Sequence, residues 1–205
     1  MNLAKTIPLA FVMIAGPQIL SAIFLATSEG WRRNSAAFVA GASISVTTIV
    51  TLAFLLSTGA SDHGTSGNTL DIIFMVLLIA AGAHTFLTRK TSKPPKWMGE
   101  LETARPKMAF RLGFLLLGVF PTDILTSIAV GGSVAKNGDP WWHVLGFVLL
   151  TLLFLALPAL LLLVLGERAE RVLPKVRDWM NTNSWIVSEC VIGLFVLITL
   201  NGMTS

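Results

Sequence analysis

Long apolar stretches alternate with short polar segments along this chain. Six of the stretches approach or exceed the length of about 20 mostly apolar residues that a transmembrane helix needs. They lie at residues 7–27, 35–56, 70–87, 108–131, 142–165 and 185–201. The pattern predicts an all-α polytopic membrane protein with six transmembrane helices and no separate soluble domain.

The first and fourth of these predicted spans contain related sequences. QILSAI at residues 18–23 is matched by DILTSI at residues 123–128, and a proline, Pro17 or Pro121, stands just before each copy. A proline within a span interrupts the backbone hydrogen bonds of the helix. Paired interruptions in the two halves of a membrane protein point to a transporter's binding site. We therefore predict a 3+3 inverted repeat with proline-broken first and fourth helices.

The repeat divides the chain into two units. Residues 1–88 are predicted to form the first three-helix repeat, residues 89–107 a cytoplasmic linker loop, and residues 108–205 the second repeat. The second repeat carries a charged insertion at about 167–183, whose apolar residues recur on one helical face: Ala169, Val172, Leu173, Val176 and Met180. The insertion is predicted to be an interfacial helix on the cytoplasmic leaflet or, equally, a solvated linker helix.

The basic residues predict the orientation of the spans. Lys and Arg concentrate in the cytoplasmic loops of membrane proteins. Thirteen of the 15 basic residues fall in the segments after the first, third and fifth spans, and only Lys5 and Lys136 fall on the other side. Both termini are therefore predicted to face outward.

Composition narrows the function classes. Charged residues make up 13% of the chain, against roughly 25% in soluble domains. The net charge of +4 is accounted for by the membrane topology, so a nucleic-acid partner is not expected. The single cysteine, Cys190, excludes a disulfide within the chain and a CxxC redox motif. No sequence pattern of a catalytic, cofactor or metal site is found, and the chain is not expected to be an enzyme.

Asp123 is the leading candidate for a functional residue. It lies just past Pro121 in the fourth span, where a charged carboxylate costs about 2.5–3.5 kcal/mol on insertion scales. Such a residue usually faces a cavity and binds a proton, a cation or a polar group of the substrate. The alternative role is to cap the half-helix that begins near Pro121, and the two roles can coexist. Gln18 is its counterpart in the first span, and its amide can hydrogen-bond a carboxyl group.

Further residues near the two breaks complete the candidate site for a substrate or coupling ion: Pro17, Pro121, Ser21, Thr122 and Thr126. For the hydroxyl groups, hydrogen bonding between helices is the favoured interpretation. His84, near the inner end of the third span, is a candidate proton relay. For this histidine, a structural position at the membrane interface is the favoured alternative.

The chain resembles a known family of exporters. Ala15-Gly16-Pro17, the basic turn at residues 28–38 and the small residues that begin at Gly41 resemble the first two spans of the LysE exporter superfamily. GVFPTD at residues 118–123 and LGERA at 165–169, with the amphipathic stretch that follows, are similar to the Gap/Sap branch. Proteins of that branch are described as addressing glycopeptidolipid or sulfolipid to the cell surface of mycobacteria and their relatives. Their fourth span more often reads Asn-Pro-Lys-Asn where this chain has FPTD, so an acid replaces an amide.

The resemblance and the residues together predict the function. We expect an exporter or flippase of the bacterial cytoplasmic (inner) membrane that moves a lipid or glycolipid towards the outer face, with membrane lipids as further partners. Alternating access would come from rocking of the two halves, coupled to the proton gradient through Asp123. The alternatives are export of a small solute, such as an amino acid or a cation, and a non-transporting scaffold for lipid-synthesis enzymes. The resemblance is compatible with a homodimer.

Overall fold

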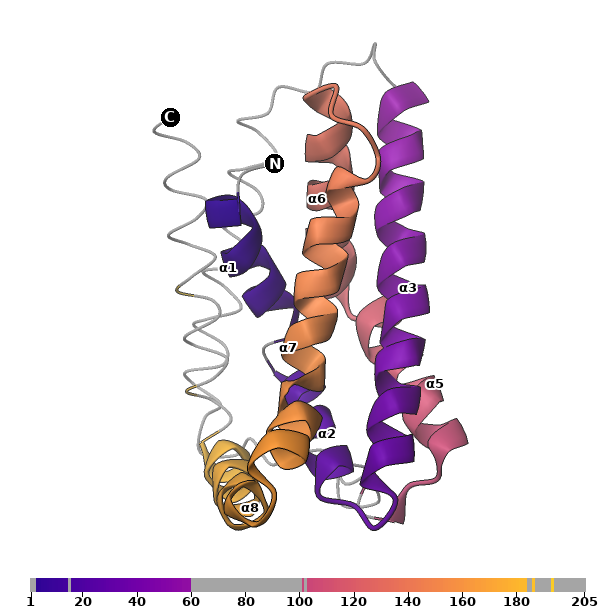
Figure 1. The fold of residues 1–205 in the computed structure, drawn as a ribbon. Helices are drawn as coiled ribbons and strands as arrows, with labels where there is room; N and C mark the ends of the chain where they lie inside the picture. Colours follow the sequence, from indigo (N-terminus) through magenta and orange to yellow (C-terminus); the bar gives the residue numbers. More distant parts are fainter. Residues whose placement is uncertain are drawn as a thin grey trace.

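The computed structural model describes residues 3–14, 16–59, 101, 103–183, 186 and 193. These residues are mostly helical, and no strand is found among them (Figure 1). The helices are α1 (Leu3–Ile14), α2 (Pro17–Ala26), α3 (Trp31–Gly59), α5 (Pro106–Val119), α6 (Pro121–Lys136), α7 (His143–Leu165) and α8 (Glu167–Thr182). The predicted third span, nearly all of the sixth and most of the predicted linker loop lie outside the described residues.

Two of the described helices, α3 and α7, are long and apolar enough to span a membrane alone. They contain 29 and 23 residues, against the roughly 20 that the hydrocarbon core requires. Two further spans are formed if each of the bent pairs, α1–α2 and α5–α6, crosses the membrane as one unit. The described part of the chain therefore contains two to four candidate spans.

The bent pairs are broken where the sequence places a proline. The bend is 68° between α1 and α2, and 65° between α5 and α6. Pro17 and Pro121 are the first residues of α2 and α6. Proline suits this position, because the first N–H groups of a helix have no partner within the helix. Both predicted breaks are therefore present in the structure.

The two bent pairs run through the molecule in opposite directions. In Figure 1, α1 lies in the upper half and α2 in the lower half, whereas the chain rises from α5 in the lower half to α6 in the upper half. α3 packs along both α5 and α6, and α7 packs along α1 and α2 as well as α3. Each straight helix therefore lies against both parts of a broken one.

Glycines allow the backbones of α3 and α5 to touch. A Cβ atom on Gly41 of α3 would collide with the carbonyl oxygen of Phe110, and one on Gly113 of α5 would collide with that of Phe38. Small residues permit this close approach between membrane helices, where van der Waals contact drives association. The backbones of α3 and α5 are therefore in direct contact at two places, with one glycine contributed by each helix.

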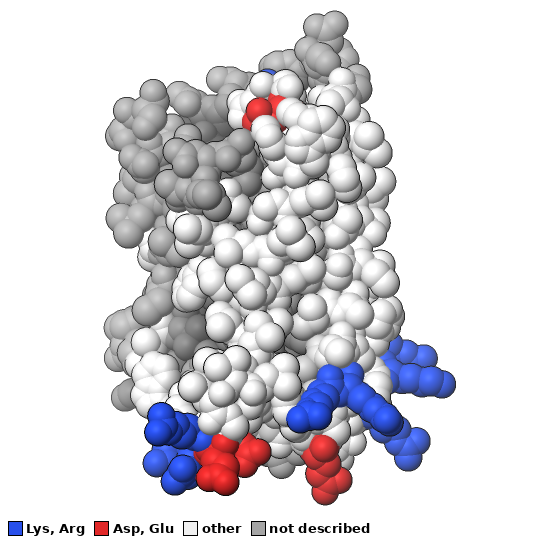
Figure 2. Space-filling view, in the orientation of Figure 1, with Lys and Arg blue, Asp and Glu red and all other residues white. Residues whose placement is uncertain are grey.

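Charged side chains gather at the ends of the molecule. Figure 2 shows two groups of basic atoms, with acidic atoms between them, at the end formed by α8 and the starts of α3 and α5. We call this the basic end; its described basic residues are Arg32, Arg33, Arg105, Lys107, Arg111, Arg168, Arg171, Lys175 and Arg177. The chain turns out of α7 at Gly166, whose φ of 49° suits glycine. α8 then lies across the basic end (Figure 1).

Candidate functional site

The structure joins the two residues that the sequence repeat relates. The amide Nε2 of Gln18 donates a hydrogen bond to the carboxylate Oδ2 of Asp123 over 2.7 Å. Gln18 is 2% exposed and Asp123 is 1% exposed. A hydrogen bond to a carboxylate is stronger than one between neutral groups. The bond links α2 to α6 at the place where both spans are broken.

Both residues lie in the first turn of a half-helix. Gln18 follows Pro17 at the start of α2, and Asp123 is the third residue of α6. The first N–H groups of a helix have no partner within it, and the aligned peptide dipoles make this end partly positive. Two such ends meet at the Gln18–Asp123 pair. They stabilise a negative charge there, whether it belongs to Asp123 or to a ligand.

One hydrogen-bond acceptor of the pair is unused. The Oε1 atom of Gln18 is buried and accepts no hydrogen bond from the residues that the structure describes. An unpaired buried acceptor costs about 1–3 kcal/mol, so its presence in a folded protein needs an explanation. An amide has both a donor and an acceptor. Gln18 can therefore donate to an ionised Asp123, or accept from a protonated carboxyl group or from an N–H or O–H of a ligand.

The hydroxyl groups beyond the pair are buried and engaged with the protein. The Oγ atom of Ser21 donates to the carbonyl oxygen of Pro17 over 2.6 Å. Thr126 is 3% exposed, and the Oγ atom of its neighbour Ser127 lies 3.9 Å from the sulfur of Met13. The Ser21 bond stays within α2 and is not the bond between helices that the sequence favours, whereas the Ser127 contact joins α6 to α1.

The remaining predicted site residues cannot be compared with the structure. His84 lies outside the described residues, as do the side chains of Pro121 and Thr122. Within the described residues, no three side chains of the types that ligate metals come together. The described centre of the site is therefore the Gln18–Asp123 pair between the two half-helices.

A second buried polar cluster, which no sequence motif indicates, lies at the basic end. Asn34 is 1% exposed, and its Nδ2 atom donates to Ser28 Oγ and to the carbonyl oxygen of Ala104, each over 2.9 Å. These bonds tie the start of α3 to the segment before α5. Asn34 directly follows Arg32 and Arg33, so its sequence neighbours indicate a surface position and give no sign of its burial.

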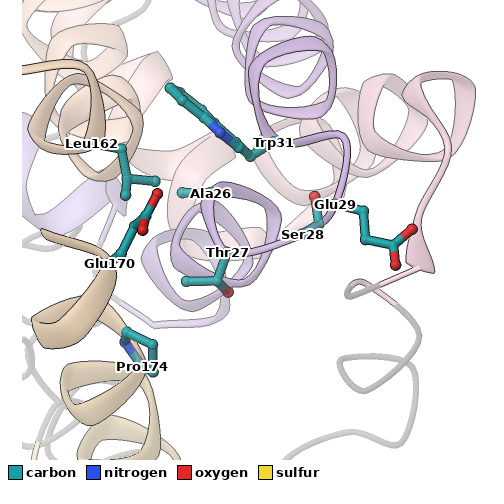
Figure 3. A pocket seen from close by; sticks show the side chains of 8 residues that line it. All are labelled: Ala26, Thr27, Ser28, Glu29, Trp31, Leu162, Glu170 and Pro174. Atoms are coloured by element: carbon teal, nitrogen blue, oxygen red, sulfur yellow. The ribbon is translucent and has the colours of Figure 1, made fainter. Parts of the chain in front are cut away.

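A half-open cavity of about 340 Å³ also lies at this end (Figure 3). It is bounded by the end of α2, the start of α3, and residues of α7 and α8: Ala26, Thr27, Ser28, Glu29, Trp31, Leu162, Glu170 and Pro174. The hydroxyl groups of Thr27 and Ser28 donate to backbone carbonyls of α2. These hydroxyl groups therefore have no hydrogen left to donate to a molecule in the cavity. The Gln18–Asp123 pair does not line this cavity.

Apolar helices of spanning length, together with a buried polar pair between two bent helix pairs, define a helical membrane protein. A model of the family described as Sap, sulfolipid-1-addressing protein (SfLAP), matches residues 6–204. The chain therefore belongs to this family, which confirms the resemblance to the Gap/Sap branch. No curated protein and no solved structure matches the chain.

Proposed function

We propose that this protein exports or flips a lipid or glycolipid towards the outer face of the bacterial cytoplasmic membrane, with Gln18 and Asp123 at the coupling site. Membership of the sulfolipid-1-addressing family supports a lipid cargo and a role in its export or localisation. The basic end would face the cytoplasm, in keeping with the distribution of Lys and Arg in membrane proteins. In this orientation both termini face outward.

The observation that carries the proposal is a buried acid hydrogen-bonded across two broken helices. An ionisable side chain inside a membrane is costly, and it usually marks a substrate or proton pathway. A purely structural link between α2 and α6 would not need an acid, since a second amide would join the helices without burying a carboxylate. The acid therefore favours proton or ion binding within a transport cycle.

The pair can act as a latch that depends on protonation. When Asp123 is ionised, the Gln18 amide donates to it and holds α2 against α6. When a proton binds Asp123, the charge-assisted hydrogen bond is replaced by a weaker neutral one. The half-helices then separate more easily, and the site opens towards the other face of the membrane. Proton movement is thereby coupled to alternating access.

The opposite courses of the two bent pairs support an inverted repeat (Figure 1). In transporters built this way, broken helices form the substrate site near the midplane, and half-helix N-termini point at anionic groups of the substrate. The N-termini of α2 and α6 both lie at the Gln18–Asp123 pair. We propose this region for the polar headgroup of the cargo, with its acyl chains outside the bundle in the lipid.

The test uses Asp123→Asn, which keeps the shape of the side chain and removes its charge. Wild type and variant are purified in mild detergent from their own membranes, bound lipids are identified by native mass spectrometry, and the same lipid is measured at the cell surface. We expect the variant to lose the specific lipid and its export rate to fall about tenfold or more, equivalent to at least about 1.4 kcal/mol. Asp139→Asn is the matched control and should change neither quantity, because Asp139 lies in the turn after α6, beside His143.

The other outcomes separate the alternatives. Retention and export unchanged in Asp123→Asn would contradict the assignment of the site. If both proteins carry only bulk phospholipid, and the variant instead loses export of an amino acid or a cation, the protein exports a small solute. If the amount of lipid at the cell surface is unchanged in Asp123→Asn but falls when residues 89–107 are disrupted, the protein is a scaffold.

A further inference from the structure

The inner face of α8 is fixed to the membrane domain. Ala169 and Leu173 are 4% and 5% exposed and pack in one apolar cluster with residues of α2 and α7. Beside them, the guanidinium carbon of Arg177 lies 5.0 Å from the centre of the Phe24 ring in α2. This distance suits a cation–π interaction. The inner face of α8 is therefore already occupied by the protein itself.

The adjoining face of α8 is apolar but uncovered. Val172, Val176 and Trp179 are 55%, 38% and 53% exposed. Their spacing of four and three residues places them in one row along the helix, which we call the apolar stripe. The last turn of α7 is also apolar and open, with Val164 80% exposed. α8 therefore begins where the lipid-facing surface of α7 ends.

Basic residues border the apolar stripe. Arg168, Arg171 and Lys175 are exposed, and their spacing of three and four residues places them on one side of α8. Arg168 and Lys175 each lie one helical turn from Val172. The acidic residues lie further round the helix from the apolar stripe: Asp178 and Glu167 directly beyond Arg171, and Glu170 beyond them. Glu170 lines the cavity against α2 (Figure 3), and basic and acidic atoms form two adjoining groups at the position of α8 in Figure 2.

We propose that α8 binds the headgroups of anionic lipids through Arg168, Arg171 and Lys175, while the apolar stripe enters the leaflet at the basic end. A helix that lies in the membrane interface needs an apolar face and a polar face rich in Lys and Arg. The outer side of α8 has both, and Trp179 is a residue type that prefers this depth. A lipid leaflet is the occupant that fits, because the stripe continues the lipid-facing surface of α7.

The arrangement also predicts which lipids bind. Three basic residues border the stripe, whereas the acidic residues lie beyond the basic row or on the side of the helix that faces the cavity. Basic residues near a membrane surface are attracted by anionic headgroups and gain little from zwitterionic ones. α8 therefore distinguishes phosphatidylglycerol from phosphatidylcholine, and this property does not depend on what the protein transports.

The first test counts bound lipid on the full-length protein. The protein is placed in nanodiscs of phosphatidylcholine and phosphatidylglycerol, and native mass spectrometry measures the phosphatidylglycerol that it retains. In the triple variant Arg168→Gln, Arg171→Gln, Lys175→Gln, we expect retained phosphatidylglycerol to fall about tenfold or more. The matched control removes three basic residues from the start of α5 at the same end, Arg105→Gln, Lys107→Gln and Arg111→Gln, and should keep most of this lipid.

The second test measures depth. In a Cys190→Ala background, a nitroxide label is attached through Val176→Cys in the stripe or Asp178→Cys on the opposite side. In nanodiscs with phosphatidylglycerol, the label at position 176 should be more accessible to oxygen than to a water-soluble nickel complex, and the label at 178 should show the reverse. None of these changes touches Ala169 or Leu173, so the docking of α8 is retained. Equal accessibility of the two labels to nickel, equal loss of phosphatidylglycerol in the two triple variants, or no loss in either would overturn the proposal.

Discussion

The two breaks bend the chain by similar angles but are built differently. The bends are 68° at the first break and 65° at the second. At the first, Gly16 has a φ of 118° and a ψ of −140°, a region that is open almost only to glycine. At the second, Phe120 has a φ of −64° and a ψ of 126°, an extended conformation that any residue adopts before a proline. A glycine in a conformation that other residues rarely adopt and an ordinary pre-proline residue therefore produce similar bends.

The difference extends to the position of the polar side chain. Gln18 comes one residue after Pro17, whereas Asp123 comes two residues after Pro121. The two side chains nevertheless meet over 2.7 Å, and glutamine is one methylene longer than aspartate. The two polar side chains meet at one point, although they occupy different positions in their helices.

The largest effect is expected when a second acid is placed at the first break, opposite Asp123. Gln18→Glu alone places two carboxylates at hydrogen-bonding distance, and two like charges about 4 Å apart repel by about 4 kcal/mol at an effective dielectric constant of about 20. We expect the free energy of unfolding to fall by about 2–4 kcal/mol at pH 8. Part of the loss should be recovered at lower pH, because one shared proton removes the repulsion. Denaturation in detergent, followed by circular dichroism, measures both effects.

The double variant Gln18→Glu/Asp123→Asn is the control for this exchange. It restores one acid and one amide with unchanged side-chain lengths, so its free energy of unfolding should return to within about 1 kcal/mol of wild type. A double variant as unstable as Gln18→Glu alone would show that the two positions are not interchangeable. If stability returns without transport, the acid has to lie on α6.

A smaller effect is expected from the backbone of the first break. Gly16→Ala should lower the free energy of unfolding by about 1–3 kcal/mol, because alanine is strained at this φ. Its Cβ atom would also lie 3.2 Å from the Oε1 atom of Gln18. Phe120→Ala is the matched change at the second break and should cost less than about 1 kcal/mol, since its backbone is unstrained. Equal losses in thermal or detergent denaturation would mean that the breaks are built alike.

The smallest effect is expected at Ser21. Its hydroxyl group donates to the carbonyl oxygen of Pro17 in the same helix, and such a bond contributes less than the average of about 0.6 kcal/mol for side-chain bonds between membrane helices. Ser21→Ala should therefore lower the free energy of unfolding by less than that amount and leave lipid export unchanged. A loss of export at unchanged stability would instead place the hydroxyl group in the path of the cargo.

The described spans and the central pair can be predicted because simple constraints determine them. Membrane thickness sets the length that a spanning helix needs, so apolar length alone locates α3 and α7, and it locates the two bent pairs as candidate spans. The repeat of QILSAI as DILTSI relates Gln18 to Asp123 through the sequence alone, and the hydrogen bond between them is present. Residues at matching positions of the two related sequences, Gln18 and Asp123, are therefore in contact in the folded chain.

Features that depend on contacts between distant segments could not be predicted. Val172 and Leu173 both fit the apolar face of α8, yet Leu173 is 5% exposed and Val172 is 55% exposed. Helical periodicity cannot make this distinction, because packing against α2 and α7 decides it. Asn34 is similar: its burial depends on a bond to Ala104, 70 residues away, which no local pattern contains.

The glycine contacts between α3 and α5 have a kinematic consequence. Gly41 faces the backbone at Phe110, and Gly113 faces the backbone at Phe38, so sliding one helix along the other would press carbonyl oxygens into the opposite chain. These contacts oppose sliding of α3 along α5, although α3 belongs to the predicted first repeat and α5 to the second. The Gln18–Asp123 bond joins the same two predicted repeats, through α2 and α6. The two predicted repeats are therefore interlocked at two places, one by backbone contact and one by a side-chain hydrogen bond.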